Sequence, residues 1–243
     1  MNPERPLLRH LFYWVLPALY MSALVALYFS GRPELVDVIA PRVAPWDYHG
    51  NRELGLLEFS EHLILALIAV IFLRAAWQPG AHLRRAGCLL LGVGFVLFLL
   101  EELDYGLHFY EWWRGEVVFR GARNLHNRGD LTQILKVAAD TVNVVWFIVL
   151  PLLALRLRHR WVSYLAPPLL ILSTVAVALG VSETVHTLAK SGFVPLVGDG
   201  EPRLALHGNL SEFRETTVFY VWLLYVHEVV TRRRWPGDDG KTA

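Results

Sequence analysis

The sequence predicts an all-α polytopic membrane protein, a six-transmembrane-helix bundle that forms one integral membrane domain over residues 1–243. Two observations lead to this prediction. The chain is 54% hydrophobic with a mean hydropathy of +0.37, and long apolar runs recur along it. No internal repeat or long polar segment divides the chain, so a single domain is expected.

Six spans can be drawn, each near the roughly 20 residues that a hydrocarbon core requires. They cover about 8–29, 54–76, 84–106, 134–156, 161–187 and 211–231. The first run follows the segment MNPERPLLRH, but it is as long as a span and lacks an A-x-A-like cleavage site. It is therefore predicted to be an uncleaved helix rather than a signal peptide.

Arginines mark alternate ends of the spans and predict the orientation. They precede the first span, join the second to the third and the fourth to the fifth, and follow the sixth: Arg5, Arg9, Arg74, Arg84, Arg85, Arg156, Arg158, Arg160, Arg232, Arg233 and Arg234. The positive-inside rule then places both termini in the cytoplasm and the longer loops outside. We expect a multi-pass protein of a bacterial inner membrane.

The segment between the third and fourth spans is predicted to lie in the membrane interface. It carries the aromatic cluster Phe109, Tyr110, Trp112 and Trp113, which is typical of the belt at the bilayer surface. The tetrad Asn124-Leu125-His126-Asn127 then leads back towards the fourth span. This position brings His126 near the helices that precede and follow it.

Acids and histidines gather at the opposite ends of the spans from the arginines. They are Glu58, Glu61 and His62, then Glu101, Glu102, Asp104 and His108, then Asp140, then Glu183 and His186, and finally Glu212 and Glu215. A bilayer interior penalises each charged group by roughly 2.5–3.5 kcal/mol even on the lenient insertion scale. Five helices contributing to one polar layer therefore predict a single cavity. Within it, Glu101, Asp104, His108 and Glu111 are spaced as one continuous helical stripe.

The residue types permit metal chemistry. His62, His126 and His186 are the expected nitrogen ligands, with Glu61 and Glu183 beside them, and this donor set favours zinc. Glu101 or Glu102 is the expected general base, and the remaining carboxylates of the cavity are Glu58, Asp104, Asp140, Glu212 and Glu215. A di-iron centre ranks lower, because Glu183-x-x-His186 is the single E-x-x-H in the chain. The lone Cys88 excludes an internal disulfide and a cysteine-based zinc site.

Two families share short motifs with this chain. Glu101-Glu102-Leu-Asp-Tyr-Gly followed by Asn-Leu-His126-Asn resembles a group of uncharacterised bacterial membrane proteins with EE-x-x-W-G and N-L-H-N, in which Trp usually stands at the position of Tyr105. That likeness covers about residues 95–130 and implies no activity. Ser60, His62 and the acids of the third span are similar to motifs of the alkaline-ceramidase-like hydrolases, which include the adiponectin-receptor type. That likeness implies zinc-dependent lipid hydrolysis, although the H-x-x-x-H of that family and its seventh span are missing here.

Three functions follow from these patterns. The first is a metal-dependent, hydrolase-like enzyme that acts on a lipid or lipid-linked substrate at the outer leaflet. The second is a structural or assembly subunit whose acids meet a membrane-protein partner. The third is a proton- or ion-coupled transporter. A transporter is less favoured, because the acids occupy only one leaflet. Membrane lipids are expected partners, and nothing in the charge pattern supports nucleic-acid binding.

Overall fold

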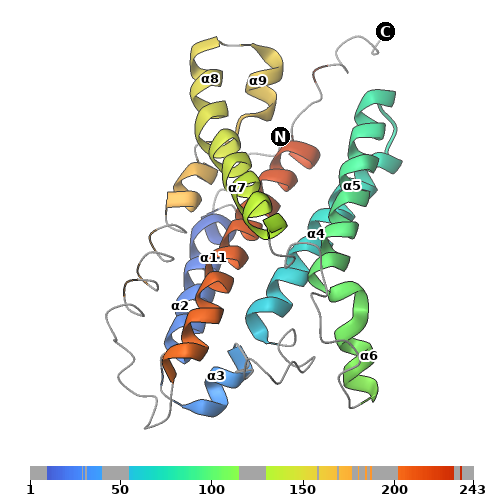
Figure 1. Cartoon of the computed structure of the whole chain (residues 1–243). Helices are drawn as coiled ribbons and strands as arrows, with labels where there is room; N and C mark the ends of the chain where they lie inside the picture. Colours follow the sequence, from blue (N-terminus) through green and yellow to red (C-terminus); the bar gives the residue numbers. More distant parts are fainter. Residues whose placement is uncertain are drawn as a thin grey trace.

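The computed structural model describes residues 10–28, 30, 32–39, 55–114, 130–157, 159–168, 170–176, 180, 184, 187, 202–232 and 236. Every regular element in these ranges is helical (Figure 1). Four helices are long and apolar enough to cross a membrane: Leu11–Tyr28, Leu56–Trp77, His82–Glu102 and Val137–Leu157. The prediction of an all-helical fold is thus confirmed for the described residues, with four candidate membrane spans, and six spans remain a proposal.

Helices α4 (Leu56–Trp77) and α5 (His82–Glu102) form an antiparallel hairpin. Phe72 and Phe95 stack across it with ring centroids 5.8 Å apart. Gly92 allows the close approach, because a Cβ at this position would lie 2.8 Å from Leu73 Cδ2. The hairpin therefore brings the first turn of α4 and the last turn of α5 to the same end of the bundle.

Helix α11 (Pro202–His227) continues as the π-helix η5 (Glu228–Arg232) and packs along α4. Buried side chains of both helices form the main apolar cluster, together with Phe147 and Tyr164. At one end of α11, Arg84 Nη2 donates to Val230 O at 3.2 Å. Near the middle of α11, Thr216 donates to Glu61, close to the start of α4. Helix α11 therefore runs parallel to α4, and both have their acidic ends on the same side.

Two prolines explain two π-helical turns in the other spans. Pro17 follows η1 (Leu11–Val15) at the start of α2 (Leu16–Tyr28), and Pro151 follows η4 (Val145–Val149) at the start of α8 (Leu150–Leu157). In both places the residue before the proline bonds five residues back, Leu16 to Leu11 O and Leu150 to Val145 O. Proline has no N–H to continue the ladder, so the helix widens there.

Neighbouring helices satisfy the carbonyl groups that Pro17 leaves without a helical donor. Thr174 Oγ1 donates to Tyr13 O at 3.1 Å, and the Tyr220 hydroxyl donates to Phe12 O. A hydroxyl from a neighbouring helix is one of the usual ways to satisfy backbone groups that proline leaves free in a membrane span. These bonds fix the first span against α11 and the segment 170–176.

Helix α7 (Asp130–Val144), η4 and α8 form one long span beside α11. Trp222 Nε1 donates to Asn143 Oδ1 at 2.8 Å, and Phe147 packs edge-on against Trp222 with centroids 5.0 Å apart. Short helices complete the fold: α3 (Pro33–Ile39) and α9 (Arg160–Leu165).

The structure corrects the prediction of one continuous fifth span over 161–187. Helix α9 ends at Leu165, residues 166–168 are not helical, and residues 170–176 are helical again. Pro167 and Pro168 are the cause, because neither can donate a helical hydrogen bond and each restricts the residue before it.

The third span also ends earlier than predicted. Helix α5 stops at Glu102, and η3 (Asp104–Gly106) separates it from α6 (Leu107–Arg114). The continuous helical stripe expected from Glu101 to Glu111 is therefore wrong. Phe109, Tyr110 and Trp113 are exposed on α6, and their interfacial position remains a prediction.

Candidate functional site

The link between α5 and α6 contains three consecutive residues with left-handed backbone. The φ angles are 49° at Asp104, 55° at Tyr105 and 83° at Gly106. Only glycine adopts this conformation freely, and other residues lose roughly 1–2 kcal/mol each. Two non-glycine residues in a row at positive φ are therefore a local strain, of the kind that clusters at functional positions.

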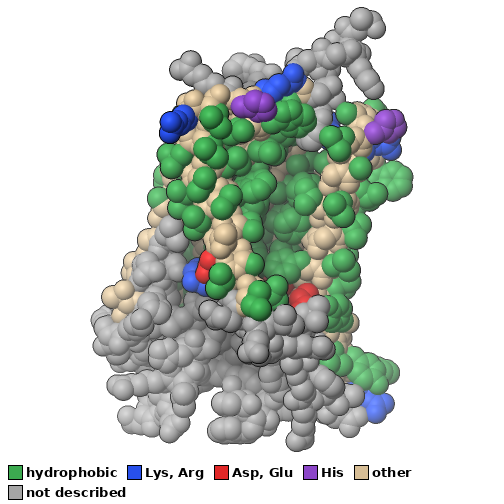
Figure 2. Space-filling view, turned by 45° about the horizontal axis from the view of Figure 1, so that its top comes forward, with side chains coloured by type: hydrophobic (Ala, Val, Ile, Leu, Met, Phe, Trp, Pro, Cys, Tyr) green, Lys and Arg blue, Asp and Glu red, His purple; other side chains and the backbone are tan. Residues whose placement is uncertain are grey.

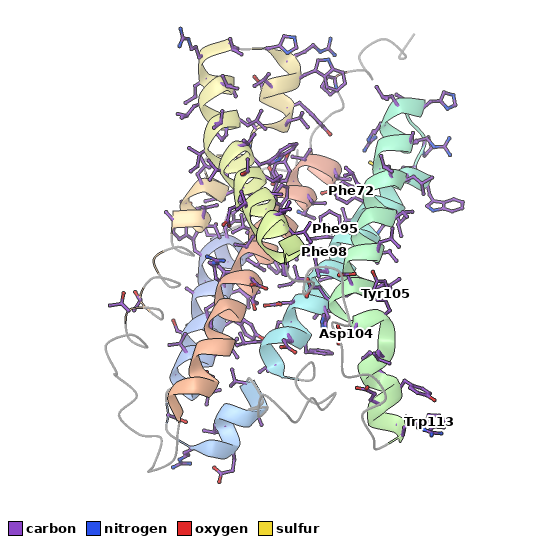
Figure 3. The ribbon with its side chains drawn as sticks, viewed as in Figure 1. Phe72, Phe95, Phe98, Asp104, Tyr105 and Trp113 are labelled. Carbon is purple, nitrogen blue, oxygen red and sulfur yellow. The ribbon has the colours of Figure 1, made fainter. Side chains whose placement is uncertain are left out.

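This left-handed turn sends neighbouring side chains in opposite directions. Asp104 is only 2% exposed, whereas Tyr105 is 55% exposed. Figure 3 shows both beyond the row of Phe72, Phe95 and Phe98 that lines the helix interface. The strain therefore places a carboxyl group inside the protein, at the end of an aromatic core.

Glu101 is held by the same turn. The Tyr105 hydroxyl donates to Glu101 Oε2 from four residues along the chain, and the Glu101 side chain is buried. In a regular helix residues four apart are neighbours on one face. The left-handed turn interrupts the helix here, but the phenol still reaches Glu101. Tyr105 thereby fixes the orientation of the Glu101 carboxyl group.

The first turns of α4 supply the second part of the site. Glu58 and Glu61 are buried, and His62 is half-buried. Thr216 Oγ1 of α11 donates to Glu61 Oε1 at 2.6 Å, and the N-terminal end of α4 favours the negative charge of Glu58. Ser60, between them, is bonded to Tyr20 of α2. Two neighbouring helices, α2 and α11, therefore fix this turn of α4.

Helix contacts bring the two parts to one level. Phe98 of α5 packs edge-on against Phe219 of α11, with centroids 5.7 Å apart. Glu101 lies three residues beyond Phe98, and Thr216 lies three residues before Phe219, in antiparallel helices. Equal rises from a shared contact place Glu101 level with Thr216, the partner of Glu61. The carboxyl groups of Glu61 and Glu101 therefore lie at about one level. Together with the other buried acids of this end of the bundle they form what we call the buried acid layer: Glu58, Glu61, Glu101, Asp104 and Glu111.

Glu111 is one of these buried acids, although it is not among the site residues predicted from the sequence. It is 3% exposed on α6, and one of its oxygen atoms is fully enclosed, as are Glu58 Oε2 and Asp104 Oδ2. Its place in the predicted acidic stripe was a signal that could have found it. Thr216 and Tyr105 were missed as well, since a hydroxyl beside an acid has no distinctive pattern.

Other predicted residues lie differently. Glu102 and Glu215 are half-buried, and Asp140 is exposed on α7. Glu212 lies on α11, but its side chain is outside the described set, as is that of His108. His126, Glu183 and His186 fall outside the described residues. The predicted acids thus divide into the buried acid layer and an accessible group, Glu102, Asp140 and Glu215.

Metal binding receives no direct support from the part of the chain that the structure describes. No group of three or more His, Cys, Asp or Glu side chains there is arranged to hold an ion. Of the five predicted ligands, only Glu61 and His62 are in this part. The zinc prediction therefore depends on residues beyond it.

No family model, curated protein or solved structure matches this chain.

Proposed function

We propose that this protein is a membrane-embedded, metal-dependent enzyme of hydrolase type that acts on a lipid or lipid-linked substrate. The observation that carries the proposal is the buried acid layer, with Asp104 held inside by a strained turn. Five buried carboxyl side chains are costly near an apolar core. Backbone strain and buried acids both lower the stability of the fold. Their occurrence together is therefore typical of a catalytic site.

The two kinds of acid suggest two roles. Glu101 is fixed by Tyr105, so it is suited to orienting other groups. Glu102 is next to it and half-buried, so its carboxylate can reach a substrate and exchange protons with it. We assign Glu102 as the general base and Glu101 as a positioning residue.

The proposed metal ligands are His62, His126 and His186, with Glu61 and Glu183. Imidazole and carboxylate donors suit zinc, which would supply Lewis-acid activation of a carbonyl or phosphoryl group. Elemental analysis of the purified full chain should give about one divalent ion per molecule. The content should fall sharply in His62→Ala and in His186→Ala. A folded, metal-free wild type would overturn the metal-dependent proposal.

The proposed setting is a bacterial inner membrane, with both termini in the cytoplasm and the acidic end in the outer leaflet. Single cysteines at Arg120 and Gly200 in a Cys88→Ser background test this orientation. A membrane-impermeant thiol reagent should label them in intact cells. Labelling only after permeabilisation would reverse the topology.

A second candidate function is an assembly subunit. Asp140 favours it, because this acid is exposed on a helix long and apolar enough to span a membrane. An exposed acid on a membrane span would be stabilised by a cation from a partner protein. The test is co-purification of a membrane protein at constant stoichiometry, which Asp140→Asn should abolish. This result, in a protein that holds no metal and turns over no lipid, would favour the assembly subunit over the enzyme.

A further inference from the structure

One face of α11 lies between two helices that both pack against it. Phe219 contacts Phe98 of α5, and Trp222 donates to Asn143 of α7. Phe219 and Trp222 are three residues apart, so they lie on the same face. Helices α5 and α7 therefore form two walls on either side of one strip of α11.

A furrow lined by apolar side chains runs between these walls. Figure 2 shows it as a recess between the α7–α8 side of the molecule and α5. On the α5 wall, Leu91 and Phe98 share a face, seven residues apart, and both are exposed. Both walls are among the helices suited to spanning a membrane, so hydrocarbon chains surround the opening of the furrow.

Each of the three helices carries an acid one turn beyond its furrow contact, and all three lie towards the acidic end. Glu102 follows Phe98 by four residues, Glu215 precedes Phe219 by four, and Asp140 precedes Asn143 by three. This is the accessible group of acids defined above. Arg214, which is exposed, is adjacent to Glu215. The furrow is thus apolar along its length and charged at one end.

We infer that this furrow holds one acyl chain of an aminophospholipid, with the lipid headgroup at Glu102, Asp140 and Glu215. A primary ammonium group has three N–H donors, which matches three carboxylates, and Arg214 fits the phosphate of the same headgroup. A headgroup with only negative charge would be repelled by the acids. The inference rests on the proposed function and gives its substrate class.

Photo-crosslinking in nanodiscs tests this inference. The full chain is placed in phosphatidylcholine with a small fraction of phosphatidylethanolamine that carries a diazirine on one acyl chain, and labelled α11 peptides are measured by mass spectrometry. Leu91→Trp is the blocking variant and Val93→Trp is its matched control. Both residues are on α5 and similarly exposed, at 50% and 45%, but they lie about 200° apart around the helix.

Leu91→Trp should reduce labelling of α11 about tenfold, whereas Val93→Trp should leave it unchanged. Labelling should also be weaker with a phosphatidylglycerol probe, and the double variant Glu102→Gln/Glu215→Gln should remove that difference. Equal labelling in the two Trp variants would show contact with bulk lipid only and overturn the inference. Equal labelling by the two headgroups would overturn its aminophospholipid part.

Labelling does not require turnover, so the two proposals can fail separately. Furrow-specific labelling in a protein that hydrolyses no lipid would retain the furrow and reject the enzyme. Lipid hydrolysis in a protein whose α11 labelling is equal in the two Trp variants would retain the enzyme and reject the furrow.

Discussion

The two ends of this bundle are built in different ways. At the arginine end, side chains donate to backbone carbonyl groups: Arg84 to Val230 O, Arg85 to Ala76 O and Tyr164 to Val229 O. At the acidic end, carboxyl groups are buried, and the chain turns through three left-handed residues. The first arrangement satisfies helix termini and stabilises the fold. The second is locally costly, which is why we assign function to it.

The largest difference between the two ends is expected when one residue is changed at each. Glu102→Gln should lower lipid turnover by about 10²–10⁴-fold, because the amide cannot act as a general base. Arg84→Gln should leave turnover unchanged while weakening a bond that stabilises the opposite end. Turnover by purified protein in liposomes checks both. Similar losses in the two variants would mean that the acidic end is not special.

Substitution of two buried threonines, one at each end, compares how much the hydrogen bonds of the two ends contribute to stability. Thr216→Val removes the donor to the buried Glu61 carboxyl and should cost about 1–3 kcal/mol of unfolding free energy. Thr174→Val removes the donor to the Tyr13 carbonyl and should cost about 0.5–1.5 kcal/mol. Reversible unfolding in mixed micelles measures both. A larger cost for Thr174→Val would contradict the assignment of the more demanding polar layer to the acidic end.

Two glycines test whether the turn is strained. Gly106→Ala should destabilise the protein by about 1–2 kcal/mol, because its φ of 83° disfavours a Cβ even though space is available. Gly94→Ala, in the α5 helix with equally open space, should stabilise it by about 0.5–1 kcal/mol. The same unfolding measurement applies. If the two substitutions change the free energy of unfolding equally, or if both stabilise the protein, residue 106 is not left-handed in solution.

The smallest expected effect comes from Tyr105→Phe. Losing the hydrogen bond to Glu101 should raise the activation free energy of turnover by about 0.5–1.5 kcal/mol. This corresponds to a few-fold decrease in turnover. Tyr110→Phe, on α6, is the matched control and should be neutral. If both variants retain full turnover, Tyr105 does not position the Glu101 carboxyl.

Much of the fold follows from sequence, because membrane thickness dictates span length. The second span, predicted at 54–76, is observed as Leu56–Trp77, and the first, predicted at 8–29, as Leu11–Tyr28. The interruption at Pro167-Pro168 was readable from the missing N–H groups, but the apolar run hid it. The end of α5 was harder to predict, because Asp104-Tyr105-Gly106 continues the helical spacing of acids although its backbone does not continue the helix.

The site is less predictable for a related reason. Helical spacing placed Glu58 with Glu61 on α4, and both are buried. It also placed Glu101 and Asp104 on one helix, but Asp104 lies beyond the end of α5 and is buried through the left-handed turn instead. It could not distinguish buried Glu101 from half-buried Glu102, because their exposure depends on Tyr105 and on packing between helices. Nor could it pair Glu61 with Thr216, which is 155 residues away in the chain.

The central claim is that the acidic end is a catalytic site for lipids. The most direct measurement is mass spectrometry of phosphatidylethanolamine liposomes containing the purified full chain, with zinc present and after chelation. We predict a cleaved lipid product that accumulates with wild-type protein, is lost on chelation and returns with added zinc, and is absent with Glu102→Gln. An intact lipid population with folded, zinc-loaded wild type, or the same product from Glu102→Gln, would contradict it.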